Sequence, residues 1–435
     1  MLKLAPRYAL AVAAFVVFIY SWETNMMQPT LPFLSREVGA TEFLVGMIMG
    51  IYALTNCGGN VFFGRISDVR GRKLPLTIGF IGAAIVLLFY SQATTPTSLL
   101  VIRVIHGFLS GALAPCSAAI LADLAPPERK GATMGIWVMA FSIGTALASP
   151  LAGTLATKYG YFAVWLTMAI AYFVTVAVIW TLLPETRQKQ AMPAQSEPVA
   201  QASYAEKPSI RSILSRRNVW AAYIGIFCLF WIMATIVVLF TAHLGQLRGV
   251  GVIGADPKMA FGILMGVFGA AAALLSYPYG RLSDVVGRKA PLIAAFLVLI
   301  ALPFLISYSS VTTIVVGWIV TYALAGALIW PSILGLLTDE LAPHERGVGM
   351  GFFMLFPTLS TAIGMPVMGI VGGMVGAATG IKFAAILPAI AFIVMLVIRP
   401  RPGIGTLGRG SKLYIAIVSV VLVLISYPLI TFLQS

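Results

Sequence analysis

The sequence predicts an all-α membrane protein made of two parallel six-helix repeats (12 transmembrane helices), followed by one extra C-terminal transmembrane helix. Apolar runs long enough to cross a bilayer recur along the 435 residues, of which 60% are hydrophobic and 10% charged. A ten-residue charged segment also occurs twice, half a chain apart. Finally, equivalent loops of the two halves fall on the same predicted side of the membrane.

The repeated segment reads GRISDVRGRK at residues 64–73 and GRLSDVVGRK at residues 280–289, with eight of ten positions identical. A second match pairs APPER at residues 125–129 with APHER at residues 342–346. Each match lies in a short charged break between apolar runs. Because both copies fall on one side, the two units are related by an axis along the membrane normal.

The order of apolar runs divides the chain into four parts. Residues 1–184 form an N-terminal six-helix bundle, and residues 185–217 form a cytoplasmic linker rich in proline, glutamine and serine. Residues 218–398 form a C-terminal six-helix bundle, and residues 399–435 hold a basic loop and the additional helix. The expected helices are at 8–32, 45–63, 74–91, 98–124, 131–157, 162–183, 218–241, 259–279, 290–308, 312–338, 347–375, 381–398 and 413–433.

The basic residues predict the orientation. With the N-terminus in the cytoplasm, inner segments hold 22 of the 28 basic residues and outer segments hold five. An N-terminus inside and, after thirteen spans, a C-terminus outside are therefore expected for a multi-pass protein of the cell (inner or plasma) membrane. The net charge of +14 is then explained by basic residues in cytoplasmic loops, which set the topology. We therefore expect no nucleic-acid partner.

The repeated segment resembles the signature loop of the major facilitator superfamily, G-x-L-x-D-x-x-G-R-K, and the resemblance covers residues 1–398. It implies a transporter in which these loops act as a gating latch on the inner side. An arginine would pair with an acid at the inner end of the fourth helix of each half, with Asp339 or Glu340 available in the second. The alternative is a topology signal that caps two helices. The latch residues are Gly64, Asp68, Gly71, Arg72 and Asp123, with Asp284, Gly287, Arg288 and Asp339 as the second set.

A second resemblance concerns energy coupling. Arg103 to Gly107 reads RVIHG, similar to the R-x-x-Q-G motif of proton-coupled members, with His106 in the place of glutamine. Residues 135–154 are similar to the antiporter motif of the drug:proton antiporter branch, but Ser149 replaces the glycine before Pro150 and one residue is extra. The first motif implies proton coupling, and the degenerate second motif leaves the direction of transport open.

Two charged residues lie inside predicted spans, Glu23 and Arg103. Such residues cost at least ~2.5–3.5 kcal/mol to insert and are functional candidates. Glu23 lies roughly 24 Å along its helix from Arg7, which places it in the outer half of the membrane. Arg103 lies near the outer end of its own helix and so also in the outer half. The two side chains could therefore pair directly.

His106 shares a face with Arg103 and suits a proton relay. Asn25 and Gln28 could add polar contacts to a proton and substrate site. Two other interpretations stay open: Glu23 could reach water at the outer interface, and His106 could be a neutral hydrogen-bonding residue.

The sequence therefore predicts a secondary transporter working by alternating access, most simply proton-coupled efflux of small amphipathic or drug-like molecules. The alternatives are proton-coupled uptake of an organic solute, and lipid or lysolipid translocation. Expected partners are a small-molecule substrate, protons and the lipid bilayer, with the chain acting as a monomer. No nucleotide-binding loop, metal cluster or catalytic triad is visible, so we expect neither an enzyme nor a cofactor or metal.

Overall fold

The computed structural model describes residues 6–125, 130–186, 210–246, 256–308, 322, 324–342 and 345–398, and those residues form helices and short connections without strands. The first half contains α1 (Pro6–Met27), α2 (Leu31–Glu37), α3 (Glu42–Arg70), α4 (Lys73–Phe89), the 3₁₀ turn η1 (Tyr90–Gln92), α5 (Pro96–Ser110), α6 (Leu113–Leu124), α7 (Lys130–Tyr159) and α8 (Tyr161–Leu182).

The second half contains α9 (Ile210–Leu214), α10 (Arg217–Thr235), the π-helical segment η3 (Ile236–Phe240), α11 (Thr241–Gln246), α12 (Pro257–Val286), α13 (Lys289–Tyr308), α15 (Leu324–Glu340), α16 (Arg346–Val375), α17 (Ala377–Phe383) and α18 (Ile386–Val397).

Ten helical stretches of the described residues are long and apolar enough to cross a membrane. The helix predicted at 290–308 is α13, whose apolar part (Lys289–Leu305) is shorter. The helix predicted at 312–338 is described from Leu324 onward, as α15. The predicted extra helix at 413–433 and most of the linker lie outside the described residues.

The first helix of each half is interrupted at the same point. The stretch Tyr8–Glu37 breaks between α1 and α2, where Pro29 removes a backbone donor and the Thr30 hydroxyl donates to the carbonyl of Met26 at 2.7 Å. The stretch Arg217–Gln246, also 30 residues long, changes to a π-helix about two-thirds of the way along. Both of these 30-residue stretches are therefore irregular at a similar distance from their start.

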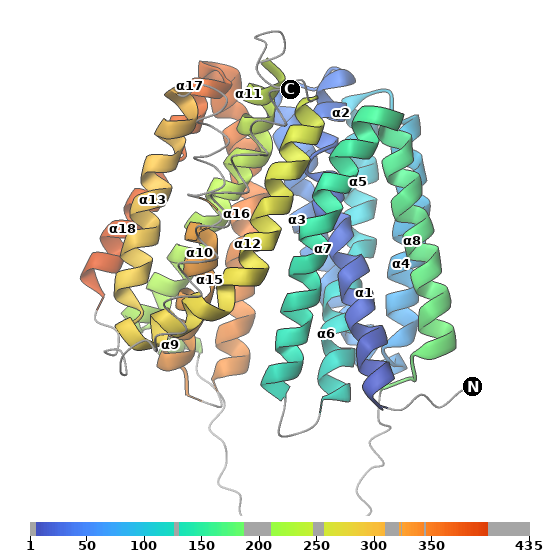
Figure 1. Ribbon diagram of the computed structural model, residues 1–435, viewed down its shortest axis with the longest axis horizontal. Helices are drawn as coiled ribbons and strands as arrows, with labels where there is room; N and C mark the ends of the chain where they lie inside the picture. Colours follow the sequence, from blue (N-terminus) through green and yellow to red (C-terminus); the bar gives the residue numbers. More distant parts are fainter. Residues whose placement is uncertain are drawn as a thin grey trace, which may run out of the picture.

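The two halves lie side by side (Figure 1), with α4 and α8 on one flank and α13 and α18 on the other. They contact each other mainly through α3 against α16 and α7 against α12. We name the end that carries the 64–73 loop the inner end, at the bottom of Figure 1 where α1 begins, and the opposite end the outer end.

The space around certain glycines shows how closely the two halves of the molecule approach each other. At the outer end, a Cβ on Gly46, Gly153 or Gly369 would lie under 3.0 Å from backbone of the opposite half, so no side chain fits there. Toward the inner end, a Cβ on Gly64 or Gly351 would meet nothing within 4 Å. The halves are therefore packed together at the outer end and separated at the inner end.

Candidate functional site

A buried polar cluster surrounds Glu23 in the first half. Its carboxylate has no exposed surface and accepts a 2.5 Å hydrogen bond from the Tyr52 hydroxyl of α3. The second carboxylate oxygen accepts a 3.2 Å bond from Tyr172 of α8, and His106 Nε2 of α5 lies 3.6 Å from the first. Four helices thus converge on one carboxylate, which places Glu23 inside the bundle and not at a hydrated interface.

Arg103 belongs to the same cluster but forms no ion pair with Glu23 in the described structure. Its guanidinium carbon lies 4.1 Å from the centroid of the Tyr52 ring, a cation–π contact, while the hydroxyl of that ring bonds Glu23. Arg103 is 2% exposed, and its Nε and Nη1 atoms have no hydrogen-bond partner among the described residues. Tyr52 therefore contacts both Glu23 and Arg103, which do not form the direct pair that their similar depth would allow.

His106 extends the cluster toward the outer end. Its Nδ1 lies 3.1 Å from the hydroxyl of Tyr90, and its Nε2 faces Glu23. A neutral imidazole has one donor nitrogen and one acceptor nitrogen. Here Nδ1 is within hydrogen-bond distance of Tyr90, whereas Nε2 makes no hydrogen bond among the described residues. Tyr90, His106 and Glu23 thus form a row of buried titratable groups.

The other predicted polar residues of helix 1 have different surroundings. Asn25 donates to the Ser21 carbonyl at 2.6 Å and to the Thr145 hydroxyl of α7 at 3.0 Å, and Ser149 of α7 donates to the Asn25 carbonyl. Asn25 therefore fastens α1 to α7. Gln28 lies at the break between α1 and α2, and its Oε1 has no partner among the described residues.

The first signature loop forms a compact ionic network. Arg72 contacts Asp68 at 2.5 Å and Asp123 at 3.2 Å, and Gly71 makes the tight turn with φ +96°. Burial lowers the pKa of Arg72, but the two carboxylates more than offset this, so its pKa is raised overall. Glu185, just beyond α8, accepts from the backbone N–H groups of Arg72 (2.9 Å) and Lys73 (3.2 Å).

The second loop repeats this arrangement with its own residues. Arg288 contacts Asp284 and, at 3.0 Å, Asp339, and Gly287 turns with φ +94°. Of the two candidate acids, Asp339 is thus the one beside Arg288, whereas Glu340 accepts a 2.7 Å bond from Asn218. Each network lies within one half and is intact although the inner ends are separated.

A second set of ionic contacts, absent from the sequence predictions, joins the two halves at the outer end. Arg36 of α2 pairs with Glu42 through two 2.8 Å bonds and donates to the carbonyl of Val238 at 2.7 Å and the hydroxyl of Thr241 at 3.1 Å. Val238 belongs to η3, and Thr241 begins α11. The broken first helix of one half therefore binds the π-helical segment of the other.

A neighbouring contact crosses the same boundary. Lys258, at the start of α12, lies 3.5 Å from Glu37 and 4.7 Å from the ring centroid of Tyr161, while the Tyr161 hydroxyl donates to Glu37 at 2.7 Å. We call the residues of these two groups the outer clasp: Arg36, Glu37, Glu42, Tyr161, Val238, Thr241 and Lys258.

A family model described as Major Facilitator Superfamily matches residues 13–255 and 253–435, which together include most of the chain. The chain belongs to the Major Facilitator Superfamily. Members of this superfamily are transporters, so the chain is a multi-pass membrane transporter and not an enzyme.

Among relatives, an uncharacterised MFS-type transporter, MJ1560 of Methanocaldococcus jannaschii, is 21% identical over 385 residues, 87% of this chain and 96% of that protein. The multidrug resistance protein MdtG of Salmonella arizonae is 25% identical over 287 residues, 64% of this chain and 67% of MdtG. A solved bacterial homologue of the human lysosomal transporter Spinster, inward-facing and unoccupied, superposes with a TM-score of 0.70 at 15% identity, covering 100% of this chain and 99% of that one.

Proposed function

We propose that this protein exports small amphipathic or drug-like molecules in exchange for protons, with Glu23 as the proton-binding group. The observation that carries the proposal is a fully buried carboxylate with three titratable neighbours and no ion pair to Arg103 among the described residues. A carboxylate in that position changes its protonation when its neighbours move, which couples proton binding to the position of helices. The similarity to MdtG supports export of drug-like compounds.

The helix contacts support a rocking motion. Along α3 and α16, Gly46 faces Met365 and Gly50 faces Ala362, so the two helices run antiparallel in a regular register. Continuing that register inward brings Asp68 level with the start of α16, whose N-terminus attracts negative charge. We infer that closure of the inner end places Asp68 at this helix end, with the ionic network of its own loop holding it there.

Transport into proteoliposomes tests the coupling. Purified protein is reconstituted, a pH gradient is imposed, and movement of ethidium is followed together with lumenal pH. Proton-driven accumulation of ethidium opposite to the proton flow is expected for the wild-type protein. Glu23→Gln is expected to lose that accumulation while keeping exchange of ethidium without a gradient. Accumulation by Glu23→Gln equal to wild type would exclude Glu23 as the proton-binding group.

The same vesicles separate the alternatives. A solute that moves in the same direction as the protons would identify uptake by symport. A fluorescent lysophospholipid that becomes inaccessible to albumin only in vesicles containing the protein would identify lipid translocation. Either result would replace efflux as the function.

A further inference from the structure

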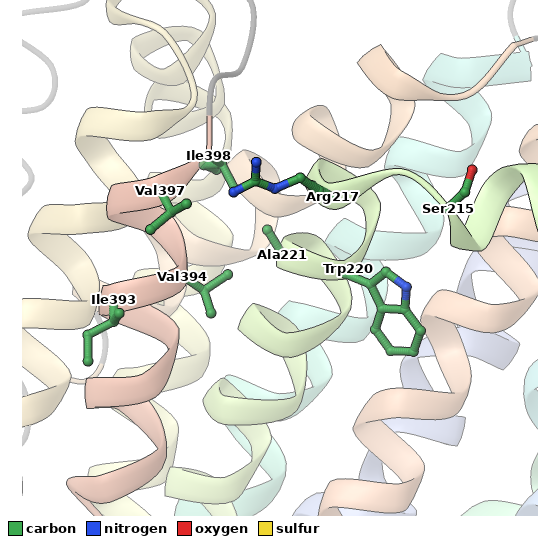
Figure 2. Close-up of a pocket in the computed structure, with 8 residues that line it drawn as sticks. All are labelled: Ser215, Arg217, Trp220, Ala221, Ile393, Val394, Val397 and Ile398. Atoms are coloured by element: carbon green, nitrogen blue, oxygen red, sulfur yellow. The ribbon is translucent and has the colours of Figure 1, made fainter.

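A groove lies between the start of α10 and the end of α18, with a volume of about 310 Å³. Five aliphatic side chains and one tryptophan form most of its wall, and Figure 2 shows them on the two facing helices. The remaining two lining residues are a serine and an arginine, so none of the described residues that line it carries a carboxylate. The residues are Ser215, Arg217, Trp220, Ala221, Ile393, Val394, Val397 and Ile398.

Two cations without a carboxylate partner in the described structure lie beside this groove: Arg217 lines it, and Lys289 bonds the backbone of Ile398, which also lines it. Arg217 extends from α10 toward Ile398 (Figure 2), and its side chain makes no hydrogen bond or ion pair among the described residues. Within the described ranges, Lys289, at the start of α13, donates only to carbonyl oxygens, those of Leu396 (2.7 Å) and Ile398 (3.0 Å). By contrast, the adjacent Arg216 is paired with Glu345 at 2.7 Å.

The position of the groove fits the membrane interface. α10 begins and α18 ends at the inner end of the molecule, so the groove opens at the level where an apolar core meets charged headgroups. Trp220 is 41% exposed and its indole N–H donates to the Leu214 carbonyl, while Ile393 and Val397 are more than half exposed. Aromatic rings with one polar bond are typical of this interface.

We propose that the groove is a binding site for an anionic phospholipid of the leaflet at the inner end. One acyl chain lies along Ile393, Val394 and Val397, and the phosphate lies at the rim between Arg217 and Lys289. The charge argues for an anionic headgroup, because basic pockets between helices on the cytoplasmic side, where the sequence predicts this end, bind acidic lipids. None of the described lining residues is acidic. Lys289 is also the last residue of the second signature loop, so the bound lipid lies beside that loop.

Native mass spectrometry of the full chain in detergent tests the site, with phosphatidylglycerol and phosphatidylethanolamine of identical acyl chains as probes. The wild-type protein is expected to retain phosphatidylglycerol preferentially. One arginine near an anionic lipid contributes enough for Arg217→Gln to weaken phosphatidylglycerol binding about fivefold. Arg211→Gln removes the same charge from exposed Arg211 of α9, outside the groove, and is expected to leave binding unchanged.

A second variant tests the apolar wall without altering charge. Val397→Trp fills the groove from an exposed position, so the fold is expected to remain intact and phosphatidylglycerol binding to fall while Arg217 is still present. Equal retention of both lipids, or equal loss in Arg211→Gln and Arg217→Gln, would overturn the proposal. The proposal would also be overturned if cysteines placed in the groove cross-linked to the apolar run 413–433 of this chain, because that run would then occupy the groove. If inorganic phosphate displaced the lipid, the site would be assigned to free anions. That result would also overturn the lipid proposal.

Discussion

Tyr52 is the residue on which the buried cluster depends most directly. Its hydroxyl makes the shortest contact to Glu23, 2.5 Å against 3.2 Å for Tyr172, and its ring face lies against Arg103. A hydrogen bond to a charged group contributes about 1.5–3 kcal/mol, more than one between neutral groups. We therefore expect proton binding at Glu23 to depend on the position of α3.

Tyr52→Phe is expected to change the pH profile of transport, because it removes the hydroxyl donor and keeps the ring beneath Arg103. Tyr172→Phe, which removes the longer bond to the same carboxylate, is expected to change it less. Initial rates of ethidium transport across a pH series check both variants. Tyr223→Phe, in the second half, loses a hydroxyl that bonds the Gly349 carbonyl and serves as the control. Equal profiles for Tyr52→Phe and wild type would show that this bond does not set proton binding.

Asp68 has an exposed side chain in this conformation and only Arg72 as an ionic partner among the described residues. A charge at a helix N-terminus contributes about 0.3–1 kcal/mol at the surface and up to ~2 kcal/mol when partly buried. Asp68→Asn is expected to reduce the inner-closed population about fivefold and slow transport accordingly. Asp284→Asn applies the same change to the second loop. Wild-type transport by Asp68→Asn would argue that the loop only sets topology and caps helices.

The first helix of each half has an element-scale role that its hydropathy does not reveal. The break between α1 and α2 turns Arg36 toward the other half, and η3 offers the carbonyl of Val238 to it. A π-helical segment leaves backbone acceptors outside the regular ladder, and such segments are common at functional sites. Two irregular segments, one from each half, therefore make a contact between the halves at the outer end, and we expect this contact to stabilise the outer-closed state.

Arg36→Gln is expected to open the outer end. Losing a charged hydrogen bond to backbone of the other half shifts the balance between outer-closed and outer-open states about tenfold. Distances between spin labels check this, with one pair at Tyr159 and Phe383 near the outer end and one at Arg65 and Val286 near the inner end. The outer distance should lengthen as the inner distance shortens.

Lys158→Gln is the matched control for the clasp, since Lys158 is an exposed outer cation with no hydrogen bond or ion pair among the described residues. Lys258→Gln is expected to act like Arg36→Gln but more weakly, because Glu37 is half exposed and solvent screens the pair. If Lys158→Gln opened the outer end as far as Arg36→Gln, total charge and not the clasp would set the equilibrium.

At the scale of the whole molecule, hydropathy predicted the apolar spans that the structure describes, because apolar length follows directly from sequence. Glu23 and Arg103, which the sequence predicts at similar depth, both contact Tyr52 in one cluster. The direction in which a side chain points around its helix could not be predicted from the sequence. The position of the Tyr52 ring between Glu23 and Arg103 was therefore missed. Tyrosines in apolar runs resemble packing residues, and only the fold shows that Tyr52, Tyr90 and Tyr172 converge. The cross-half contact of Arg36 depends on two helix irregularities that periodicity does not encode.

The antiparallel register between the halves leads to a test of the complete motion. The face of α3 that contacts α16 at Gly46 and Gly50 continues inward through Val61, which is 53% exposed. Counting along the register, Val61 comes level with Gly351, where a Cβ would meet nothing in this conformation. Cysteines at the two positions are therefore too far apart to form a disulfide in this conformation. We expect them to become adjacent when the inner end closes.

The variant Val61→Cys with Gly351→Cys, in a Cys57→Ser background, is expected to form a disulfide slowly under mild oxidation, because bonding requires Cα atoms within about 7 Å. Adding Arg36→Gln should speed the reaction about tenfold, since opening the outer end and closing the inner end are one movement of rigid bundles. Gel mobility under non-reducing conditions measures the rate, and each single-cysteine variant gives the background. If Arg36→Gln left the rate of disulfide formation unchanged, the two ends of the molecule would open independently. The bundles would then bend during transport and would not rock as rigid bodies.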